Sequence, residues 1–357
     1  MNITRIRAYS RDLRLRKPYT IAYETITSVE NVFVEVELAN GLIGRGAANP
    51  APEVVGETPA QTLANLHDER VTSLVGQDIR LFMGLIRQLH EQFPAAPGTV
   101  AALDIALHDA FGQWMGVPVV AFYGQTITEL PTSVTIGILD VADTLAEAAE
   151  YVRLGFRALK IKTGLSAEED AERVIKLRER VGPNVAIRVD ANQGYSPADL
   201  RQFLNTTASA SVELIEQPLP VGQEDDLRTL PADIRRRLVA DESLTNPESA
   251  LRLLTGPPPF GVFNIKLMKC GGIRRALDIA TLARSAVVTL FWGCNDESII
   301  SITAALHAAF ASPNTRYLDL DGSFDLAEDI VAGGFRLRDG CLSPVGGAGL
   351  GLSPLSA

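Results

Sequence analysis

The chain has 357 residues, of which 46% are hydrophobic, and a formal net charge of −10 at pH 7. This length is sufficient for two domains with separate cores, and the acidic balance argues against nucleic acid or an anionic membrane as a partner. No apolar run reaches the roughly 20 residues of a membrane span, and the N-terminus lacks an apolar signal segment. The three cysteines (Cys270, Cys294 and Cys341) are too scattered for a disulfide framework. We therefore expect a cytoplasmic protein.

The first part of the chain, residues 1–125, is expected to form an α+β capping domain. Runs of alternating apolar and polar residues on both sides of Asn40-Gly41 predict an antiparallel hairpin. The segment Lys17–Asn31 has no clear period and is expected to be a mobile loop. Helical spacing follows, with a packed helix around Ala101–His108. Strands first and helices second indicate a domain of their own.

From residue 126 onward, short apolar strands alternate with helical stretches. The predicted strands are Thr132–Gly137, Arg157–Lys162, Ala186–Asp190, Val212–Glu216, Leu238–Asp241, Phe263–Lys266, Val288–Trp292 and Arg316–Asp319. Eight such units are typical of a closed parallel barrel, so we expect an α/β barrel over residues 126–321. Residues 322–357 are expected to return to the capping domain. A doubly wound open sheet is the alternative, but its glycine-rich phosphate-binding turn does not follow the early strands.

Charged side chains stand at the ends of most of these strands. They are Lys162, Asp190, Glu216, Asp241, Lys266 and Asp319. Because the active face of a barrel lies at the carboxyl ends of its strands, we expect these side chains to meet. Three buried carboxylates need a cation between them, and oxygen ligands without His or Cys suit Mg²⁺. The sequence therefore predicts Mg²⁺ on Asp190, Glu216 and Asp241, with salt bridges to the lysines and Arg188 as the alternative.

Two lysines should face each other across the barrel mouth, since Lys162 ends the second strand and Lys266 the sixth. A substrate carboxylate bound at the metal would hold its α-carbon between the two amines. One lysine would remove the α-proton and the other would return a proton on the opposite face. Lys160 lies on the same strand face as Lys162 and would make it easier to deprotonate. The arrangement predicts a 1,1-proton transfer that inverts a stereocentre.

Five motifs resemble those of a known family. They are Lys-Ile-Lys, Val-Asp-Ala-Asn, Ile-Glu-Gln-Pro, Ala-Asp-Glu-Ser and Asn-Ile-Lys-Leu-Met-Lys-Cys-Gly-Gly-Ile, in this order. Together they resemble the enolase superfamily, and the pair Lys160/Lys162 opposed to Lys266 is similar to its muconate-lactonising subgroup. The resemblance implies a (β/α)7β TIM-type barrel with an N-terminal cap, and Mg²⁺ on the three carboxylates named above.

The last barrel strand indicates the substrate. Asp319 and Asp321 share one strand face and resemble the Asp-x-Asp of dipeptide epimerases, where it holds the dipeptide N-terminus. Thr135, Cys294 and Asp296 resemble further substrate contacts, and Lys160 is counted with them. The resemblance implies Mg²⁺-dependent epimerisation at the α-carbon of the C-terminal residue of a dipeptide. We also expect a homo-oligomer.

Glu24 departs from the pattern of the Ala–Glu-specific epimerases, which have an arginine at this place in the cap loop. A glutamate there would repel an acidic second residue. Glu24 and Asp296 would accept a cationic side chain, whereas Tyr19, Ile21 and Tyr23 would accept an apolar one, and both preferences stay open. Alternative functions on the same scaffold are an N-acylamino-acid racemase, an o-succinylbenzoate synthase or muconate cycloisomerase, and a binding protein without catalysis.

Overall fold

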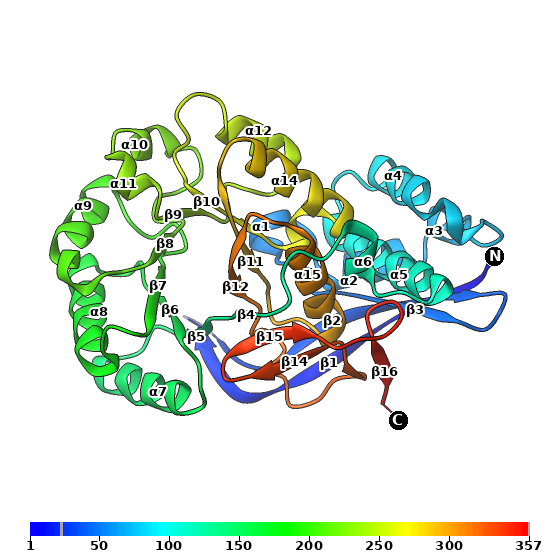
Figure 1. The fold of residues 1–357 in the computed structure, drawn as a ribbon, viewed down its shortest axis with the longest axis horizontal. Coiled ribbons are helices and arrows are strands. Elements are labelled where there is room, and N and C mark those ends of the chain that lie inside the picture. The colour runs from blue at the N-terminus through cyan, green and yellow to red at the C-terminus, as the bar shows by residue number, and fades with distance from the viewer. Residues whose placement is uncertain (22–23, 356–357) are drawn as a thin grey trace.

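The computed structural model describes residues 1–21 and 24–355. An antiparallel sheet covered by helices lies beside a barrel of eight parallel strands that is ringed by helices (Figure 1). The expected fold, an α/β barrel with an α+β capping domain, is confirmed. Among the described helices, none combines the length and the apolarity that crossing a membrane requires.

The capping sheet has the order β1-β2-β3. Its strands are β1 (Ile3–Ile21), β2 (Glu24–Leu38) and β3 (Ile43–Ala48). β2 and β3 pair on both sides of Asn40-Gly41, as predicted. Gly44 and Gly46 of β3 lie so close to helix α5 (Pro97–Met115) that any side chain there would overlap backbone oxygens of the helix. The sheet and α5 are therefore in direct backbone contact.

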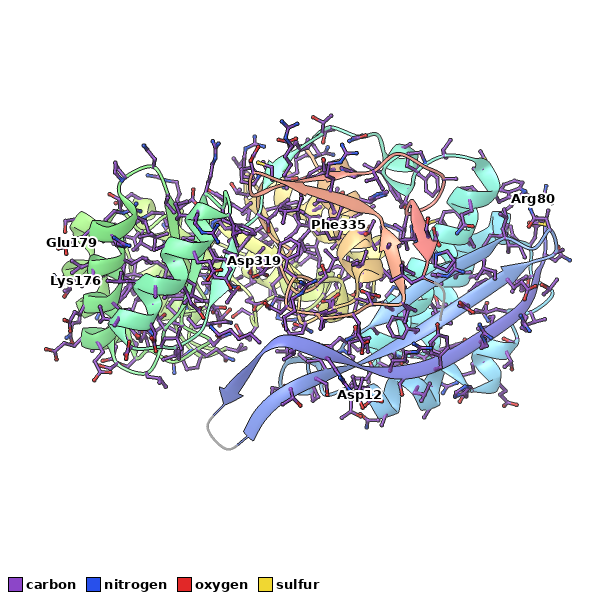
Figure 2. All side chains as sticks on the ribbon, turned by 90° about the horizontal axis from the view of Figure 1, so that it is seen from below. Asp12, Arg80, Lys176, Glu179, Asp319 and Phe335 are labelled. Carbon is purple, nitrogen blue, oxygen red and sulfur yellow. The ribbon has the colours of Figure 1, made fainter. Side chains whose placement is uncertain are left out.

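The predicted loop over Lys17–Asn31 is wrong. β1 and β2 continue as a long antiparallel pair to Ile21 and Glu24, with a register shift between Arg14 and Tyr19. Thr, Ile and Val residues early in β2 favour a strand. The shift coincides with Pro18, which has no N–H for the ladder, and this interruption hides the alternation in the sequence. The hairpin extends from the capping sheet toward the barrel (Figure 2).

The helices of the capping domain pack on one another and on the sheet. They are α1 (Pro52–Val55), α2 (Pro59–Leu66), α3 (Glu69–Thr72), η1 (Ile79–Leu81), α4 (Phe82–Gln92), α5 and α6 (Val119–Tyr123). Helix α5 contains the predicted packed helix and is buried over most of its length. A helix that is apolar all round must be covered on every side, and α5 touches β3, α4 and the barrel helix α13 (Leu267–Cys270).

The barrel strands follow chain order around the ring, each parallel to its neighbour. They are β5 (Val134–Ile136), β6 (Ala158–Lys162), β7 (Ala186–Asp190), β8 (Leu214–Glu216), β9 (Leu238–Ala240), β10 (Val262–Ile265), β11 (Thr289–Gly293) and β12 (Thr315–Asp319). A bridge between Thr132 and Leu318 brings the first and last strands together, with Ser133 N–H donating to the Leu318 carbonyl at 2.9 Å. The ring is therefore nearly closed.

Helices surround the barrel on its outer side. They are α7 (Val141–Arg153), α8 (Ala167–Val181), α9 (Pro197–Thr206), η2 (Ala208–Ala210), α10 (Glu224–Arg228), α11 (Ala232–Arg235), α12 (Pro247–Leu253), α13, α14 (Ile273–Ser285) and α15 (Ile299–Ala311). Ser166 caps α8 by accepting from the Glu169 N–H.

Inside the barrel, an apolar layer lies below a polar one. Leu214, Val239, Val262 and Phe291 form a separate buried cluster, with Tyr317 packed against it. The Arg188 guanidinium lies over the Phe291 and Tyr317 rings at 5.3 and 5.0 Å. Because side chains alternate along a strand, the next inward positions come two residues later, at the strand ends. Those positions include the four acids Asp190, Glu216, Asp241 and Asp319 of the predicted site.

The C-terminal segment contacts both the capping domain and the start of the barrel. Its strands are β13 (Val331–Gly333), β14 (Phe335–Arg338), β15 (Cys341–Pro344) and β16 (Leu352–Pro354). β15 pairs with β4 (Leu130–Pro131), and Leu326 bridges Leu15 of β1. The buried Asp109 of α5 accepts from the N–H groups of Leu350 at 2.8 Å and Arg45 at 2.9 Å. This carboxylate thus ties the C-terminal turn and β3 to α5.

Replacing Asp109 by alanine is expected to lower the free energy of unfolding by roughly 2 kcal/mol or more, because two backbone N–H groups lose their buried acceptor. Urea unfolding followed by circular dichroism measures this change. Glu328, an exposed glutamate of the same C-terminal segment, provides the control, since Glu328→Ala should leave the midpoint nearly unchanged. Equal stability of the Asp109→Ala variant and the unmodified protein would contradict the assigned contacts.

Candidate active site

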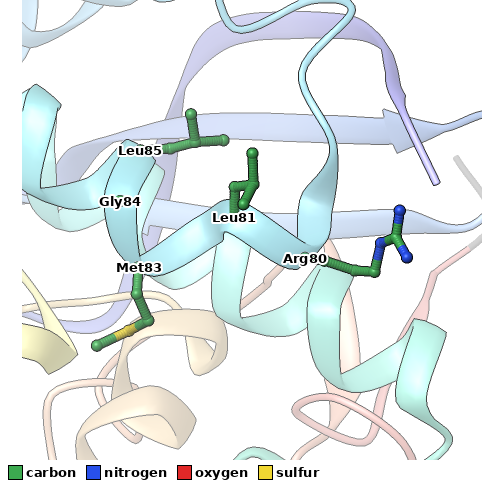
Figure 3. A pocket seen from close by; sticks show the side chains of 5 residues that line it. All are labelled: Arg80, Leu81, Met83, Gly84 and Leu85. Atoms are coloured by element: carbon green, nitrogen blue, oxygen red, sulfur yellow. The ribbon is translucent and has the colours of Figure 1, made fainter.

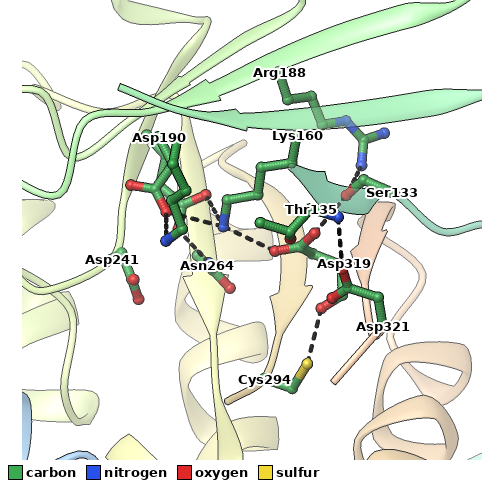
Figure 4. A network of polar contacts seen from close by, with 12 residues as sticks. Ser133, Thr135, Lys160, Arg188, Asp190, Asp241, Asn264, Cys294, Asp319 and Asp321 are labelled. Atoms are coloured by element: carbon green, nitrogen blue, oxygen red, sulfur yellow. Dashed lines mark hydrogen bonds and ion pairs between the residues drawn. The ribbon is translucent and has the colours of Figure 1, made fainter. Parts of the chain in front are cut away.

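Most of the predicted site residues gather at the mouth of the barrel, at the carboxyl ends of the strands, and Figure 4 shows Asp190, Asp241 and Asp319 among them. Asp190 and Glu216 are direct neighbours on β7 and β8, and Lys162 of β6 pairs with Asp190. The exposed fractions of Asp190, Glu216 and Asp241 are 0%, 1% and 2%. Carboxylates buried to this extent need cations beside them.

Lys160 provides the central positive charge. Its Nζ lies 2.8 Å from Asp319 Oδ2, 2.9 Å from Glu216 Oε2 and 3.1 Å from Asp190 Oδ2. Burial alone would lower the pKa of this ammonium, but the three carboxylates outweigh burial and hold its pKa well above the ordinary lysine value. Lys160 is therefore a fixed cation. Its charge is compensated by these acids, whereas the strand pattern predicts that Lys160 makes Lys162 easier to deprotonate.

Lys162 and Lys266 are held by different carboxylates. Lys162 Nζ donates to Asp190 Oδ2 at 2.8 Å and to Asn192 Oδ1 at 2.9 Å. Lys266 Nζ donates to Asp241 Oδ2 at 2.8 Å. In the barrel order, β7, β8 and β9 lie between their two strands, so the two amines approach the mouth from opposite sides of an eight-stranded ring. One carboxylate cluster thus lies between two lysines.

The predicted metal ligands do not form a preformed cage. Within residues 1–21 and 24–355, no three carboxylate, imidazole or thiol groups already surround a common point, because lysine Nζ atoms stand between the acids. Burial, followed by the negative charge of Asp190, raises the pKa of Glu216 to about 8. Among the three predicted ligands, Glu216 is therefore the acid that the lysines stabilise least in its charged form. A set of carboxylate oxygens without His or Cys fits Mg²⁺, which would compete with the lysines for these oxygens.

The sequence left open that salt bridges to the lysines and Arg188, in place of a metal ion, balance the three acids. Of these salt bridges, those to the lysines are present. Arg188 does not pair with the three acids, since its Nε donates to Glu213 Oε2 at 2.8 Å and its Nη1 donates to the Leu318 carbonyl at 2.9 Å. Arg188 lies two residues before Asp190 on β7, so its side chain points into the barrel in the layer below the three acids. Arg188 belongs to the barrel floor.

Three further polar residues, which are not among the predicted site residues, support the cluster. Lys269 Nζ donates to Asp241 Oδ1, and to the backbone oxygens of Asp241 and Asn264 at 2.6 and 3.1 Å. Asn264 Nδ2 donates to Glu216 Oε1 at 2.7 Å. Ser133 Oγ donates to Asp319 Oδ1 at 2.6 Å. Asn264 could have been found from its place two residues before Lys266, on the same strand face.

The two acids of the last strand have different partners. Asp319 pairs with Lys160, whereas Asp321 Oδ2 accepts from the backbone N–H of Thr135 at 2.7 Å. Burial, and then the charges of Asp319 and Asp325, raise the pKa of Asp321 to about 7. Asp319 is thus already compensated within the protein, and Asp321 is the acid with charge available for a cation.

Cys294 lies beside this strand end. Its Sγ donates to the Asp319 carbonyl at 3.2 Å and accepts from the Gly322 N–H at 3.3 Å. Burial raises the pKa of its thiol well above the ordinary value. These contacts hold the β12 exit in place, so we expect an unreactive thiol.

More acidic residues lie where the long hairpin approaches the barrel. Asp296 is half-buried after β11, and its backbone oxygen accepts from Asn31 Nδ2 at 3.2 Å. Burial, followed by the charge of Asp296, raises the pKa of Asp325 to about 6. Arg16 of β1 contacts the same segment, because its backbone N–H donates to the Asp325 carbonyl at 2.7 Å. Glu24 begins β2, but its side chain lies outside the described part of the chain.

The pocket shown in Figure 3 belongs to a different part of the molecule. It is lined by Arg80, Leu81, Met83, Gly84 and Leu85, from η1 and α4. None of the predicted site residues contributes to it. The charged cluster at the barrel mouth therefore remains the candidate active site.

Comparison with known proteins supports a family assignment for both parts of the chain. Residues 3–124 match the model of the mandelate racemase/muconate lactonizing enzyme N-terminal domain, and residues 143–356 match the enolase C-terminal domain-like model. The chain is 51% identical to the L-Lys-D/L-Arg epimerase of Desulforapulum autotrophicum over 352 residues, covering 99% of each. It is 31% identical to the L-Ala-D/L-Glu epimerase of Clostridium acetobutylicum, covering 96% of each.

A solved structure shows the same fold in full. It is the dipeptide epimerase of Methylococcus capsulatus in complex with Mg and the dipeptide L-Arg-D-Lys, with a TM-score of 0.96, 49% identity and 99% coverage of both chains. The barrel, the cap and the matched sequence motifs lead to one assignment. The chain belongs to the mandelate racemase/muconate lactonizing enzyme family of the enolase superfamily.

Proposed function

We propose that this dipeptide epimerase acts on dipeptides with cationic side chains and inverts the α-carbon of their C-terminal residue. The observation that carries the proposal is the placement of Lys162 and Lys266 on opposite sides of one buried carboxylate cluster. Two amines on opposite faces of a carbon acid can exchange its proton with inversion. The similarity to an L-Lys-D/L-Arg epimerase supports the choice of substrate.

Asp190, Glu216 and Asp241 would hold Mg²⁺, in keeping with a similar epimerase that was crystallised with Mg and a dipeptide. When bound, Mg²⁺ supplies positive charge that stabilises the enediolate form of the substrate. The protein residues handle the proton. One lysine, as the neutral amine, accepts the α-proton, and the ammonium of the other donates a proton to the opposite face. Lys160 stays protonated and keeps Asp190 and Glu216 in place.

The dipeptide N-terminus would bind at Asp321. This acid is buried, and Thr135 fixes its orientation. A carboxylate in such a place forms a charge-assisted hydrogen bond with an ammonium group. An N-acylated amino acid offers no such cation, and this distinguishes the proposed activity from N-acylamino-acid racemisation.

A cationic side chain fits the acids beside the long hairpin. Asp296 and Asp325 lie near enough for the charge of one to raise the pKa of the other. Their negative charge, which Lys17 and Arg16 of β1 offset in part at Asp325, would attract a lysine or arginine side chain and repel a glutamate. Glu24, in the same hairpin, would add to this preference. These acids count against Ala–Glu as the preferred substrate.

A dipeptide library incubated in D₂O with Mg²⁺, and read by mass spectrometry, tests the proposal. We expect α-deuterium in the C-terminal residue, with kcat/KM for Lys- and Arg-containing dipeptides at least about tenfold above that for Glu-containing ones, a difference of about 1.4 kcal/mol. Equal or better turnover of X-Glu dipeptides would overturn the cationic preference. Exchange in N-acyl amino acids but in no dipeptide would favour the racemase alternative.

A further inference from the structure

The backbone that carries Lys266 is held from outside the barrel. Lys266 is the N-cap residue of the short helix α13, and Gly271, with φ +86°, is its C-cap residue. Gly272 follows and precedes α14. Gly272 is the N-cap residue of α14 but has no side chain to accept a hydrogen bond, so the first N–H groups of that helix need an acceptor from elsewhere.

Asp104 of the capping helix α5 supplies this acceptor. Its Oδ1 accepts from the Ile273 N–H at 2.8 Å and its Oδ2 from the Arg274 N–H at 3.2 Å. Asp104 is fully buried. It lies so close to Gly272 that a side chain at position 272 would collide with it. One carboxylate of the cap thus closes the N-terminus of a barrel helix.

Asp104 is itself held by a buried pair in the capping domain. His108 Nδ1 lies 2.8 Å from the Asp104 backbone oxygen and 3.1 Å from Oδ1. Both neighbours of Nδ1 are acceptors, so Nδ1 carries the hydrogen. His108 Nε2 lies 2.7 Å from the Tyr123 hydroxyl. The contact with His108 therefore helps to fix the orientation of the Asp104 carboxylate.

The other lysine is supported differently. The Lys162 backbone oxygen accepts from Arg173 Nη2 at 2.9 Å, and Arg173 pairs with Asp170 at 2.5 Å. Asp170 also accepts from the Gly164 N–H at 2.8 Å. All of these residues belong to β6, α8 and the loop between them. Lys162 is thus fixed by the barrel, and the Lys266 segment by the cap.

We propose that Asp104 is a positioning residue for Lys266, which it holds at the barrel mouth by fixing the junction between α13 and α14. The inference rests on the proposed two-lysine function. Helix α13 transmits the effect, because its N-cap Lys266 and its residue Lys269 both bind Asp241. Loss of the Asp104 contacts should therefore displace one base and leave the other in place.

Deuterium exchange at the α-carbon without a change of its configuration reports on one lysine at a time, and so distinguishes the two bases. Each epimer of a dipeptide substrate is incubated in D₂O with Mg²⁺, and deuterium is measured in the recovered starting epimer. The variants Lys162→Ala and Lys266→Ala first identify which epimer each lysine deprotonates. In Asp104→Ala and Asp104→Asn, we expect exchange of the Lys266 epimer to fall by about 10- to 100-fold, as for a base misplaced by about 1 Å. Exchange of the Lys162 epimer should stay close to that of the unmodified enzyme.

Asp109→Asn is the matched control. Asp109 lies on the same helix, is equally buried and also binds backbone N–H groups, but it holds the C-terminal turn. It should leave the ratio of the two exchange rates unchanged. If Asp104→Ala does not fold, Asp104→Asn, which keeps one acceptor oxygen, gives the same comparison. Equal losses for both epimers, or no loss, would overturn the inference. If the unmodified enzyme exchanges neither epimer, the proposed function fails instead.

Discussion

Replacing either Lys162 or Lys266 by alanine is expected to reduce epimerisation in both directions by at least about 10³-fold, within the range for loss of a general acid–base group. Inversion needs removal of a proton on one face and delivery on the other, so the loss of one amine stops it from both epimers. The remaining lysine should still exchange the α-proton of the one epimer that it faces. Polarimetry measures epimerisation, and deuterium incorporation measures exchange.

Lys176 provides the control for this pair. It lies on the outer face of α8 and pairs with Glu179 at 3.1 Å, away from the barrel mouth (Figure 2). Lys176→Ala should keep full activity. Two-way turnover at the normal rate in either of the other variants would mean that the two-base assignment is wrong.

The charged residues of the mouth could be predicted because barrel geometry is periodic. Each of Asp190, Glu216 and Asp241 follows an apolar strand, and parallel strands place their ends at one edge. Side-chain alternation then decides which residues point inward. Local sequence is sufficient for these steps, and the observed strands end where the sequence places them, within a residue or two.

The connections between distant segments could not be predicted in this way. Asp104 meets Ile273 across 169 positions of the chain, and only the docking of cap on barrel brings them together. The different partners of Asp319 and Asp321 likewise depend on where Lys160 Nζ lies, which strand pattern does not fix. The long hairpin was missed for a local reason, since Pro18 interrupts the alternation of β1.

The activity on dipeptides should fall in acid because of Asp321. Burial and the neighbouring charges of Asp319 and Asp325 raise its pKa to about 7. Below this pH the carboxyl is protonated and no longer attracts the substrate ammonium, so kcat/KM should decline about tenfold per pH unit below pH 7. Above the substrate α-amino pKa, roughly 7.7–8.0, the ammonium itself is lost. A pH profile of kcat/KM should therefore show an acid limb near 7.

Two variants test whether Asp321 is the group whose protonation causes the loss of activity at low pH. Asp321→Asn should lower kcat/KM by about 10- to 100-fold, the loss of a hydrogen bond between charged groups, and should abolish the acid limb. Asp325→Asn removes one of the charges that raise the pKa of Asp321, so the limb should persist but move to lower pH. These two outcomes separate the titrating group from its neighbour. An acid limb that stays at the same pH in Asp321→Asn would place the titration on another group and would leave the dipeptide N-terminus without its proposed partner.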